Sequence, residues 1–395
     1  MKIFKNSALL MVGLLFFSCT EDKAILLDDV DDSIKNYQIP KAPVNTNYTV
    51  GAIYTRYVPN PSITLVDSPS FGVFNEGTGN ASTYSEHVKQ AQTAGIDFFI
   101  FNLRCSVRSN ITDYVQSANP EYTTDKNYID KLQTAPNAGD MKFAFSYNFE
   151  SFRLRKDFFP TFYIEKLNLV NAFIKDFELM IPYFEKSNYM IINDKGVDKA
   201  VVYINNSHNL FSEDNRALYK KLRDDLRAKM KMSSNPKLQN LELYLIGMQP
   251  EWTPPLRYLG EKENNRFEGC VDALTITNYA NINRGFTERR NYFHNYIDQA
   301  WSYHKETLAK YNVEFVPTIS PSYNAVNDNN YDFPKKIFKE DWFKANCNIA
   351  RRASGTNKLV IIDSFNNWNL DTQIESATSY GDMYLKILKS EFKVN

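Results

Sequence analysis

Five carboxylates follow candidate β-strands, where they could carry out acid–base chemistry: Glu150, Glu251, Asp328, Asp371 and Glu375. Hydrolysis of a glycosidic bond needs two such groups, one protonated and one ionised, about 5 Å apart in retaining enzymes and roughly 6.5–9.5 Å apart in inverting ones. We expect the catalytic residues to be Glu251, Asp371 and Glu150, because apolar Trp252 would raise the pKa of Glu251 toward that of a general acid. Taken singly, each carboxylate is more commonly a cap or an ion-pair partner.

The same strand ends are rich in Asn, Tyr and Trp. An amide both donates and accepts hydrogen bonds, which suits vicinal hydroxyls, and an aromatic ring can cover the C–H face of a sugar. Any single Asn could instead be a turn former, but the recurrence at nearly every strand end favours a carbohydrate cleft. We predict that its substrate-binding residues are Tyr54, Tyr57, Asn102, Tyr147, Asn205, Trp252, Asn278, Tyr279, Tyr323, Asn366, Asn367, Trp368 and Asn369.

Short β-branched or aromatic runs alternate with amphipathic helical segments along the chain, which indicates βα units and a parallel sheet. The predicted strands cover residues 49–54, 97–102, 142–147, 200–205, 242–247, 273–278, 314–319 and 359–364. Eight strands with crossover helices favour a single-domain α/β fold, the (β/α)₈ TIM barrel, whose functional residues lie at the C-terminal ends of the strands. Asp363, which lies inside the last strand, is predicted to be a buried structural residue.

Helices are predicted over residues 84–94, 128–133, 164–184, 213–230, 287–311, 341–352 and 380–392. Gly95 is the expected C-terminal cap of the first of these helices, and Ser212 is the expected N-cap of the helix that starts at residue 213. No glycine-rich phosphate-binding motif follows any strand, which argues against a nucleotide site.

Bulk composition excludes several classes of partner. The chain has 46 basic and 46 acidic side chains, so no net charge favours nucleic acid or a bare membrane surface. Its four His residues have no metal-ligand spacing, and we expect neither a metal nor a cofactor. Cys105, Cys270 and Cys347 are predicted to be buried free thiols. A glycan or polysaccharide is the expected partner.

The N-terminus has the pattern of a targeting segment. Lys2 and Lys5 precede an apolar run over residues 8–17, and Ser18-Cys19 follows, an order that resembles a bacterial lipoprotein signal. We expect a signal peptide over residues 1–18, lipidation of Cys19, an acidic flexible tether over 19–45 and the barrel over 46–395. An ordinary signal peptide with an incidental Cys19 is the alternative. The acidic tether resembles the export signal of surface lipoproteins of the Bacteroides group, which implies a cell-surface protein that meets the outer membrane only through its lipid.

The segment from Ser364 to Glu375 resembles the motif Ser-Phe-Asn-Glu-Trp-His-Glu-Gly-Thr-Gln-Ile-Glu of the family 99 glycoside hydrolases, the endo-α-mannosidases. Residues 87–101, 189–204 and 316–323 are similar to segments of family 99-like and family 71-like proteins, and the resemblance implies a (β/α)₈ barrel. Eight positions of the motif match: Ser364, Phe365, Asn366, Trp368, Thr372, Gln373, Ile374 and Glu375.

The two catalytic Glu positions of family 99 fall on Asn367 and Leu370, its His falls on Asn369, and its Gly falls on Asp371. Neither Asn nor Leu can act as a general acid or base. Three outcomes stay open: Asp371 acts from a shifted loop opposite Glu251 or Glu150, other carboxylates act throughout, or the cleft binds a glycan without cleaving it. The first two describe a glycoside hydrolase for a host or dietary polysaccharide, with α-mannosides among the candidate substrates. The third describes a non-catalytic glycan-binding lipoprotein.

Overall fold

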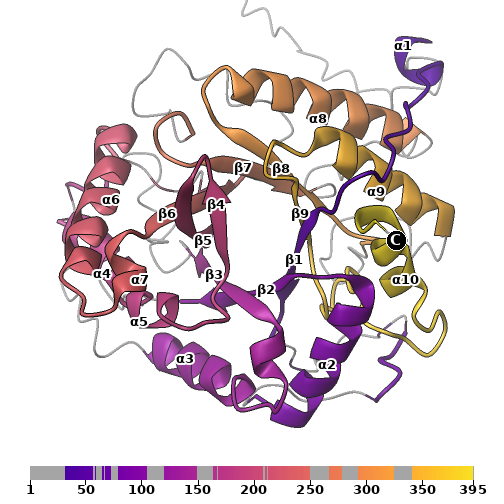
Figure 1. Cartoon of the computed structure of the whole chain (residues 1–395). Coiled ribbons are helices and arrows are strands. Elements are labelled where there is room, and N and C mark those ends of the chain that lie inside the picture. The colour runs from indigo at the N-terminus through magenta and orange to yellow at the C-terminus, as the bar shows by residue number, and fades with distance from the viewer. Residues whose placement is uncertain are drawn as a thin grey trace, which may run out of the picture.

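Eight parallel strands close into a barrel that helices surround, so the predicted fold class is confirmed (Figure 1). The computed structural model describes residues 32–56, 58, 65, 67–72, 79–104, 120–148, 163–166, 168–207, 210, 212–249, 267–277, 292–323 and 340–394. The parallel strands are β1 Thr49–Tyr54, β2 Phe98–Leu103, β3 Lys142–Asn148, β5 Val197–Asn205, β6 Glu242–Met248, β7 Ala273–Thr277, β8 Glu314–Ile319 and β9 Leu359–Ile362. Each corresponds to one predicted strand, with ends shifted by at most three residues.

The barrel closes where β3 pairs with β5, and β1 lies between β2 and β9. A ninth strand, β4 (Ile191–Asp194), runs antiparallel to β5 and was not predicted. Its hairpin turns at Lys195 and Gly196, both with positive φ (53° and 85°), which is the backbone that a tight two-residue hairpin requires. Ile192 packs against the barrel interior, so this hairpin lies over the N-terminal ends of the strands and leaves the C-terminal ends for the site.

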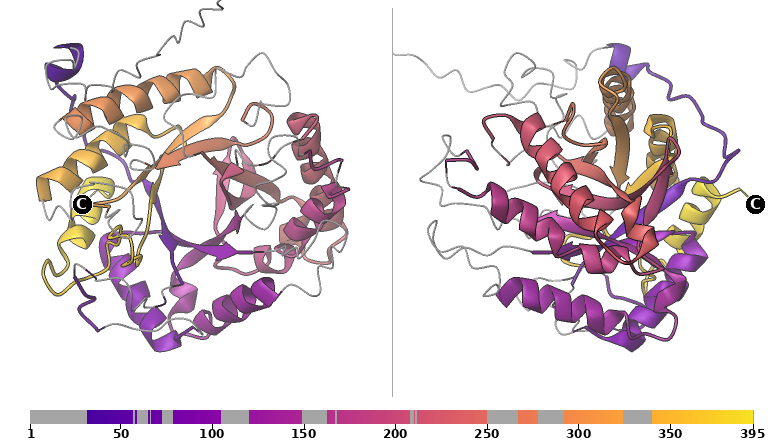
Figure 2. Two further views of the ribbon diagram at one scale, coloured as in Figure 1. Left: turned by 180° about the vertical axis from the view of Figure 1, so that it is seen from behind. Right: turned by 60° about the vertical axis from the view of Figure 1, so that its left-hand side comes forward.

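The helices form the outer layer of the molecule (Figures 1 and 2). They are α1 Asp32–Lys35, α2 Ala81–Ala94, α3 Pro120–Leu132, α4 Val170–Glu178, α5 Ile181–Phe184, α6 Asn215–Lys231, α7 Pro236–Gln239, α8 Phe293–Ala309, α9 Glu340–Ala353 and α10 Met383–Phe392, with a 3₁₀ turn at Ala138–Asp140. Gly95 ends α2 at φ 70°, as predicted.

Two helix predictions are corrected. The single helix expected over residues 164–184 is two helices, α4 and α5, and Pro182 lies in the first turn of the second. Ser212 does not cap α6: Asp214 does, because its side chain accepts a hydrogen bond from the Ala217 N–H at 3.1 Å. The Ser212 hydroxyl donates instead to Glu165.

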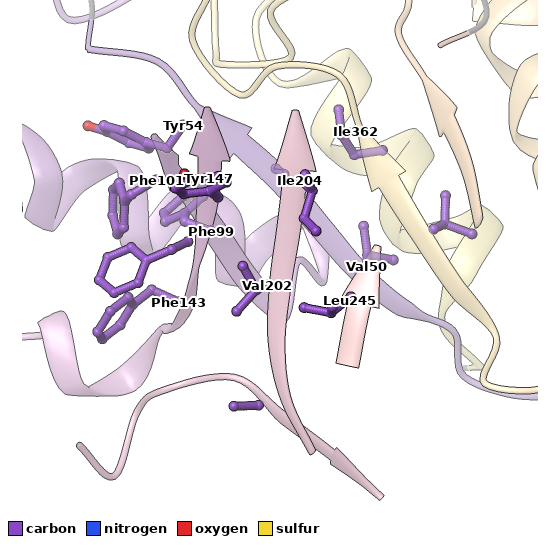
Figure 3. Packing of buried hydrophobic residues seen from close by; sticks show 14 of the residues in the cluster. Val50, Tyr54, Phe99, Phe101, Phe143, Tyr147, Val202, Ile204, Leu245 and Ile362 are labelled. Atoms are coloured by element: carbon purple, nitrogen blue, oxygen red, sulfur yellow. The ribbon is translucent and has the colours of Figure 1, made fainter. Parts of the chain in front are cut away.

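Strand side chains alternate between two hydrophobic clusters, as a period of two requires. Phe99, Phe101 and Phe143 point outward and pack side by side beneath the helices (Figure 3). Phe98 points inward, and a Cβ on Gly51 would lie 2.4 Å from its ring. Glycine at position 51 therefore makes room for an aromatic ring inside the barrel.

Part of the predicted tether lies against the barrel. The Tyr37 hydroxyl donates to Asp298 of α8 at 2.5 Å, and Asn348 of α9 accepts from the Ala42 N–H at 2.9 Å. Cys270 and Cys347 are buried free thiols, as predicted. Among the residues described above, none of the helices is both long and apolar enough to cross a membrane.

Candidate functional site

A cleft of about 670 Å³ opens at the C-terminal ends of the strands. Its floor and walls come from inward-facing residues of the strands and from the loops that follow them. Four amides, five hydroxyl-bearing side chains and a charged cluster line it, with several apolar side chains between them. The lining residues are Ile53, Tyr54, Thr55, Arg56, Val58, Phe101, Asn102, Arg104, Asp125, Tyr128, Ser146, Asn148, Tyr203, Asn205, Met248, Asp363, Asn367 and Leu370.

Asp363 lines this cleft at the end of β9, where it was expected to be purely structural. Leu359 and Ile361 of the same strand belong to the barrel interior, so the period of two turns Asp363 inward as well. Burial raises the pKa of Asp363 to about 6, and the nearby Thr372 hydroxyl acts in the opposite direction. Within the described residues Asp363 has no ion-pair partner, so it can hold a proton near neutral pH.

Tyr203 of β5 contributes its phenol to the same interior. Burial raises the pKa of Tyr203 well above its ordinary value, and the carboxylate of Asp363 adds to that rise. The phenol is therefore a neutral hydrogen-bond group close to Asp363.

Asn367 and Leu370 also line the cleft. These are the two positions at which the catalytic carboxylates of the family 99 motif would stand. The loop after β9 thus brings the expected positions to the cleft, but with an amide and an alkyl side chain that cannot exchange protons.

The two motif carboxylates, Asp371 and Glu375, do not line the cleft. Each is 2% exposed. Asp371 adopts a positive φ of 53°, and its carbonyl accepts a hydrogen bond from the Ser322 hydroxyl. The shifted-loop role expected for Asp371 therefore has no support in this geometry.

Glu375 is the centre of a buried hydrogen-bond network. One of its oxygens lies 3.0 Å from His87 Nε2, and the other accepts from the Trp368 indole N–H at 2.8 Å. His87 Nδ1 lies 2.7 Å from the Tyr54 hydroxyl. Tyr54 and Trp368 were both expected to contact sugar, but each is 2% exposed. Their hydrogen bonds instead connect the loop after β9 to α2 and β1.

Asn366 fixes the start of the same loop to β1. Its side-chain oxygen accepts from the Thr55 N–H at 2.8 Å, and its side-chain amide donates to the Thr55 carbonyl at 2.9 Å. At 1% exposure it has no surface left for a ligand. Asn366 is therefore a scaffold residue that positions Asn367 in the cleft wall.

Asn366→Ala is expected to lower the free energy of unfolding by about 2–3 kcal/mol, because two backbone groups lose their partner in a buried place. Chemical denaturation followed by circular dichroism would measure the loss. Asn205→Ala, a cleft residue that is less buried, is the control and should change stability far less. Equal stability of Asn366→Ala and wild type would contradict the scaffold role.

The other predicted binding residues divide into three groups. Asn102 and Asn205 line the cleft with Asn367. The Tyr147 hydroxyl donates to Asp176 of α4 at 2.8 Å in the outer layer, and Tyr323 and Asn369 do not line the cleft. Eight further predicted or candidate residues lie outside the described residues: Cys19, Tyr57, Glu150, Glu251, Trp252, Asn278, Tyr279 and Asp328.

Further residues that the sequence did not single out complete the site. Asp125 and Tyr128 come from α3, and Ser146 and Asn148 from β3. Ser146 and Asn148 could have been predicted from the alternation of inward and outward side chains along β3. The helix residues carried no comparable signal. The described chain holds no group of three or more His, Cys, Asp or Glu side chains suited to a metal ion.

The raised pKa of Asp363 makes a prediction about stability. Its ordinary value is 3.8 and its folded value about 6, so the folded state holds the proton more tightly. The tighter binding of this proton stabilises the folded state fully below about pH 4, and the stabilisation is lost as the pH rises through about 6. The Asp363→Asn variant, which has no charge to bury, should be about 1–3 kcal/mol more stable than wild type at about pH 8 and equal to it at about pH 4. Thermal unfolding at both pH values measures this, and a gain that is the same at both would contradict the assignment.

No family model matches the chain, and no curated protein matches it. Two solved glycoside hydrolases share the fold alone. One is the GH99 endo-alpha-mannosidase from Bacteroides thetaiotaomicron (16% identity, 88% of this chain and 97% of that chain, TM-score 0.51). The other is a GH5_18 protein from Bifidobacterium longum subsp. infantis (11% identity, 89% and 80%, TM-score 0.50).

A third solved structure is more similar. It is described as a glycoside hydrolase-like protein, is 34% identical, and superposes with a TM-score of 0.75. The alignment covers 92% of this chain and 99% of that chain. The chain belongs to the family of this glycoside hydrolase-like protein.

Proposed function

We propose that this protein binds a glycan in the cleft and hydrolyses a glycosidic bond there, with Asp363 as the proton donor. The observation that carries the proposal is an unpaired, half-buried carboxyl with a pKa of about 6 in a cleft lined by amides and hydroxyls. A general acid must keep its proton at working pH, and burial, the main cause of the raised pKa of Asp363, favours the protonated form. Membership of a glycoside hydrolase-like family supports the same class of chemistry.

Protonated Asp363 would donate to the glycosidic oxygen as the C–O bond breaks. A second, ionised carboxylate must attack the anomeric carbon or activate water. Asp125 cannot serve, because Arg104 holds both of its oxygens at 2.6–2.8 Å. Glu150 and Glu251 are the proposed partners: they follow β3 and β6, whose last residues, Asn148 and Met248, line the cleft.

A second candidate function is glycan binding without hydrolysis. The observation that favours it is the pair Asn367 and Leu370 in the cleft wall, where the family 99 motif would place carboxylates. The amide lining would then serve recognition alone.

We further propose that the protein is a lipoprotein anchored at Cys19 in the outer membrane and exposed at the cell surface, where a polysaccharide would reach the cleft. The basic and apolar order of residues 1–18, followed by Cys19, supports this. An α-mannoside is a candidate substrate because of the motif from Ser364 to Glu375. Mass spectrometry of the membrane fraction would detect diacylglycerol on Cys19, and an unmodified, secreted chain would refute the anchor.

The function is tested by incubating the protein with a panel of plant, fungal and host glycans, measuring both affinity and release of reducing ends. Affinity with release supports hydrolysis. Affinity without release for any glycan supports the second candidate. Absence of affinity across the panel would refute both.

A further inference from the structure

We infer that the cleft takes an anionic glycan and that Arg56 binds a carboxylate or sulfate group on one of its sugars. This inference rests on the proposed function and names the class of its substrate. It is carried by a charged corner of the cleft wall formed by Arg56, Arg104 and Asp125. Among the described residues, this corner carries two positive charges and one negative charge.

Arg104 makes the direct hydrogen bonds to the Asp125 carboxylate. The Asp125 side chain is 6% exposed and accepts three hydrogen bonds from Arg104: from the backbone N–H at 3.0 Å, from Nε at 2.8 Å and from Nη2 at 2.6 Å. A guanidinium that meets a carboxylate through two parallel donors is the strongest form of this pair. Asp125 therefore needs no second cation.

Arg56 is the second cation. Its Nη1 lies 4.0 Å from the nearest Asp125 oxygen, beyond hydrogen-bond distance. Its guanidinium stands 5.9 Å from the centre of the Tyr128 ring. In the described part of the chain it makes no hydrogen bond, and its Nε is buried without an acceptor. Arg56 thus presents a positive charge and unused donors to the cleft.

This arrangement is costly unless a ligand completes it, because a buried donor without an acceptor loses its hydration. The other acidic group of the described cleft, Asp363, forms no ion pair with Arg56, so none of the residues that the structure describes neutralises this charge from across the cleft. A guanidinium offers a planar fork that matches a carboxylate or sulfate oxygen pair. Asn102 and Asn205 remain for the hydroxyl groups of the same glycan.

The test compares three oligosaccharides of equal length by titration calorimetry: a neutral one, one that contains uronic acid and one that carries sulfate esters. Wild type is expected to bind one of the two anionic compounds about tenfold to a hundredfold more tightly than the neutral one. Arg56→Gln is expected to lose this preference and to keep the neutral affinity. The variant should fold normally, because Asp125 keeps its pairing with Arg104.

Arg227→Gln is the matched control. Arg227 pairs with Glu242, the first residue of β6, at the opposite end of the barrel. Arg227→Gln removes the same charge as Arg56→Gln but far from the cleft, so the preference for the anionic compound should be unchanged in this variant. The comparison between uronate and sulfate identifies which oxyanion the corner takes.

The possible failures are distinguishable. Equal affinity of wild type for neutral and anionic compounds would overturn the inference and leave the proposed function standing. A preference that survives Arg56→Gln would overturn it in the same way. Absence of binding to every glycan, in this set and in the broad panel, would overturn the proposed function and the inference together.

Discussion

Asp363→Asn is expected to lower the rate of glycosidic hydrolysis by about 10²–10⁴ while the affinity for the same glycan stays unchanged. Asparagine has nearly the same shape as aspartic acid but cannot donate a proton to a leaving oxygen. Asp363 lines the cleft and, within the described residues, has no ion-pair partner, and an asparagine can still accept a hydrogen bond from the nearby Thr372 hydroxyl. This variant should therefore bind the glycan as wild type does but hydrolyse it far more slowly.

Steady-state release of reducing ends and titration calorimetry would measure the two properties on one preparation. Asp198→Asn is the matched control: Asp198 is an exposed residue near the start of β5, at the opposite end of the barrel. It should leave both quantities at the wild-type level. Full activity in Asp363→Asn would contradict the assigned role, and a loss of affinity equal to the loss of rate would point to a binding residue.

Glu375→Ala is expected to lower the free energy of unfolding by roughly 3–5 kcal/mol, since two buried polar groups lose their common partner. His87 and Trp368 would be left facing a cavity in a region where each is 2% exposed. The loop from Ser364 to Glu375 would also lose its tie to α2. Urea denaturation measured by tryptophan fluorescence would give the loss.

Glu375→Gln is the matched variant with an expected loss below about 1 kcal/mol. Its amide oxygen can still accept from the Trp368 indole N–H, and its amide nitrogen can donate to His87 Nε2 if the imidazole proton moves to Nδ1, where the Tyr54 hydroxyl can accept it. If Glu375→Ala were as stable as Glu375→Gln, the network would have no structural role.

The barrel could be predicted from the sequence because its strands are short, apolar runs separated by helical periods. Residues 49–54 and 314–319 agree with β1 and β8 to the residue. The β4 hairpin was not predicted, because β4 has only four residues and its apolar run continues closely into β5, which makes the two strands hard to separate in the sequence. The break between α4 and α5 was not predicted, because the helical spacing of apolar residues continues across it. The helical backbone itself is interrupted between Glu178 and Ile181.

The site was harder to predict, and Asp363 and Trp368 show why. A tryptophan in a polar loop was predicted to contact a sugar ring. Trp368 is instead buried, and its indole N–H donates a hydrogen bond to Glu375. An acid inside an apolar strand suggested structure, yet its inward position places it in the cleft. The side of a strand that faces the lumen decides the place of Asp363, and contacts with distant residues decide that of Trp368. Both depend on the closure of the barrel, which no single segment encodes.

The motif from Ser364 to Glu375 is thus chiefly a scaffold. Asn366, Trp368 and Glu375 hold the loop to β1 and α2, whereas Asn367 and Leu370 lie in the cleft wall and cannot exchange protons. The proposed proton donor, Asp363, lies directly after β9 and before this loop.

The most direct test of Asp363 as the proton donor is the pH dependence of glycan hydrolysis from about pH 4 to about pH 9, measured for wild type and for Asp363→Asn. If Asp363 is the proton donor, kcat/KM of wild type should fall as the pH rises through about 6, the pKa that burial gives this carboxyl. Asp363→Asn should show little activity and no such fall. Hydrolysis in both proteins with the same pH profile, or a bound glycan that wild type never cleaves at any pH, would contradict the account.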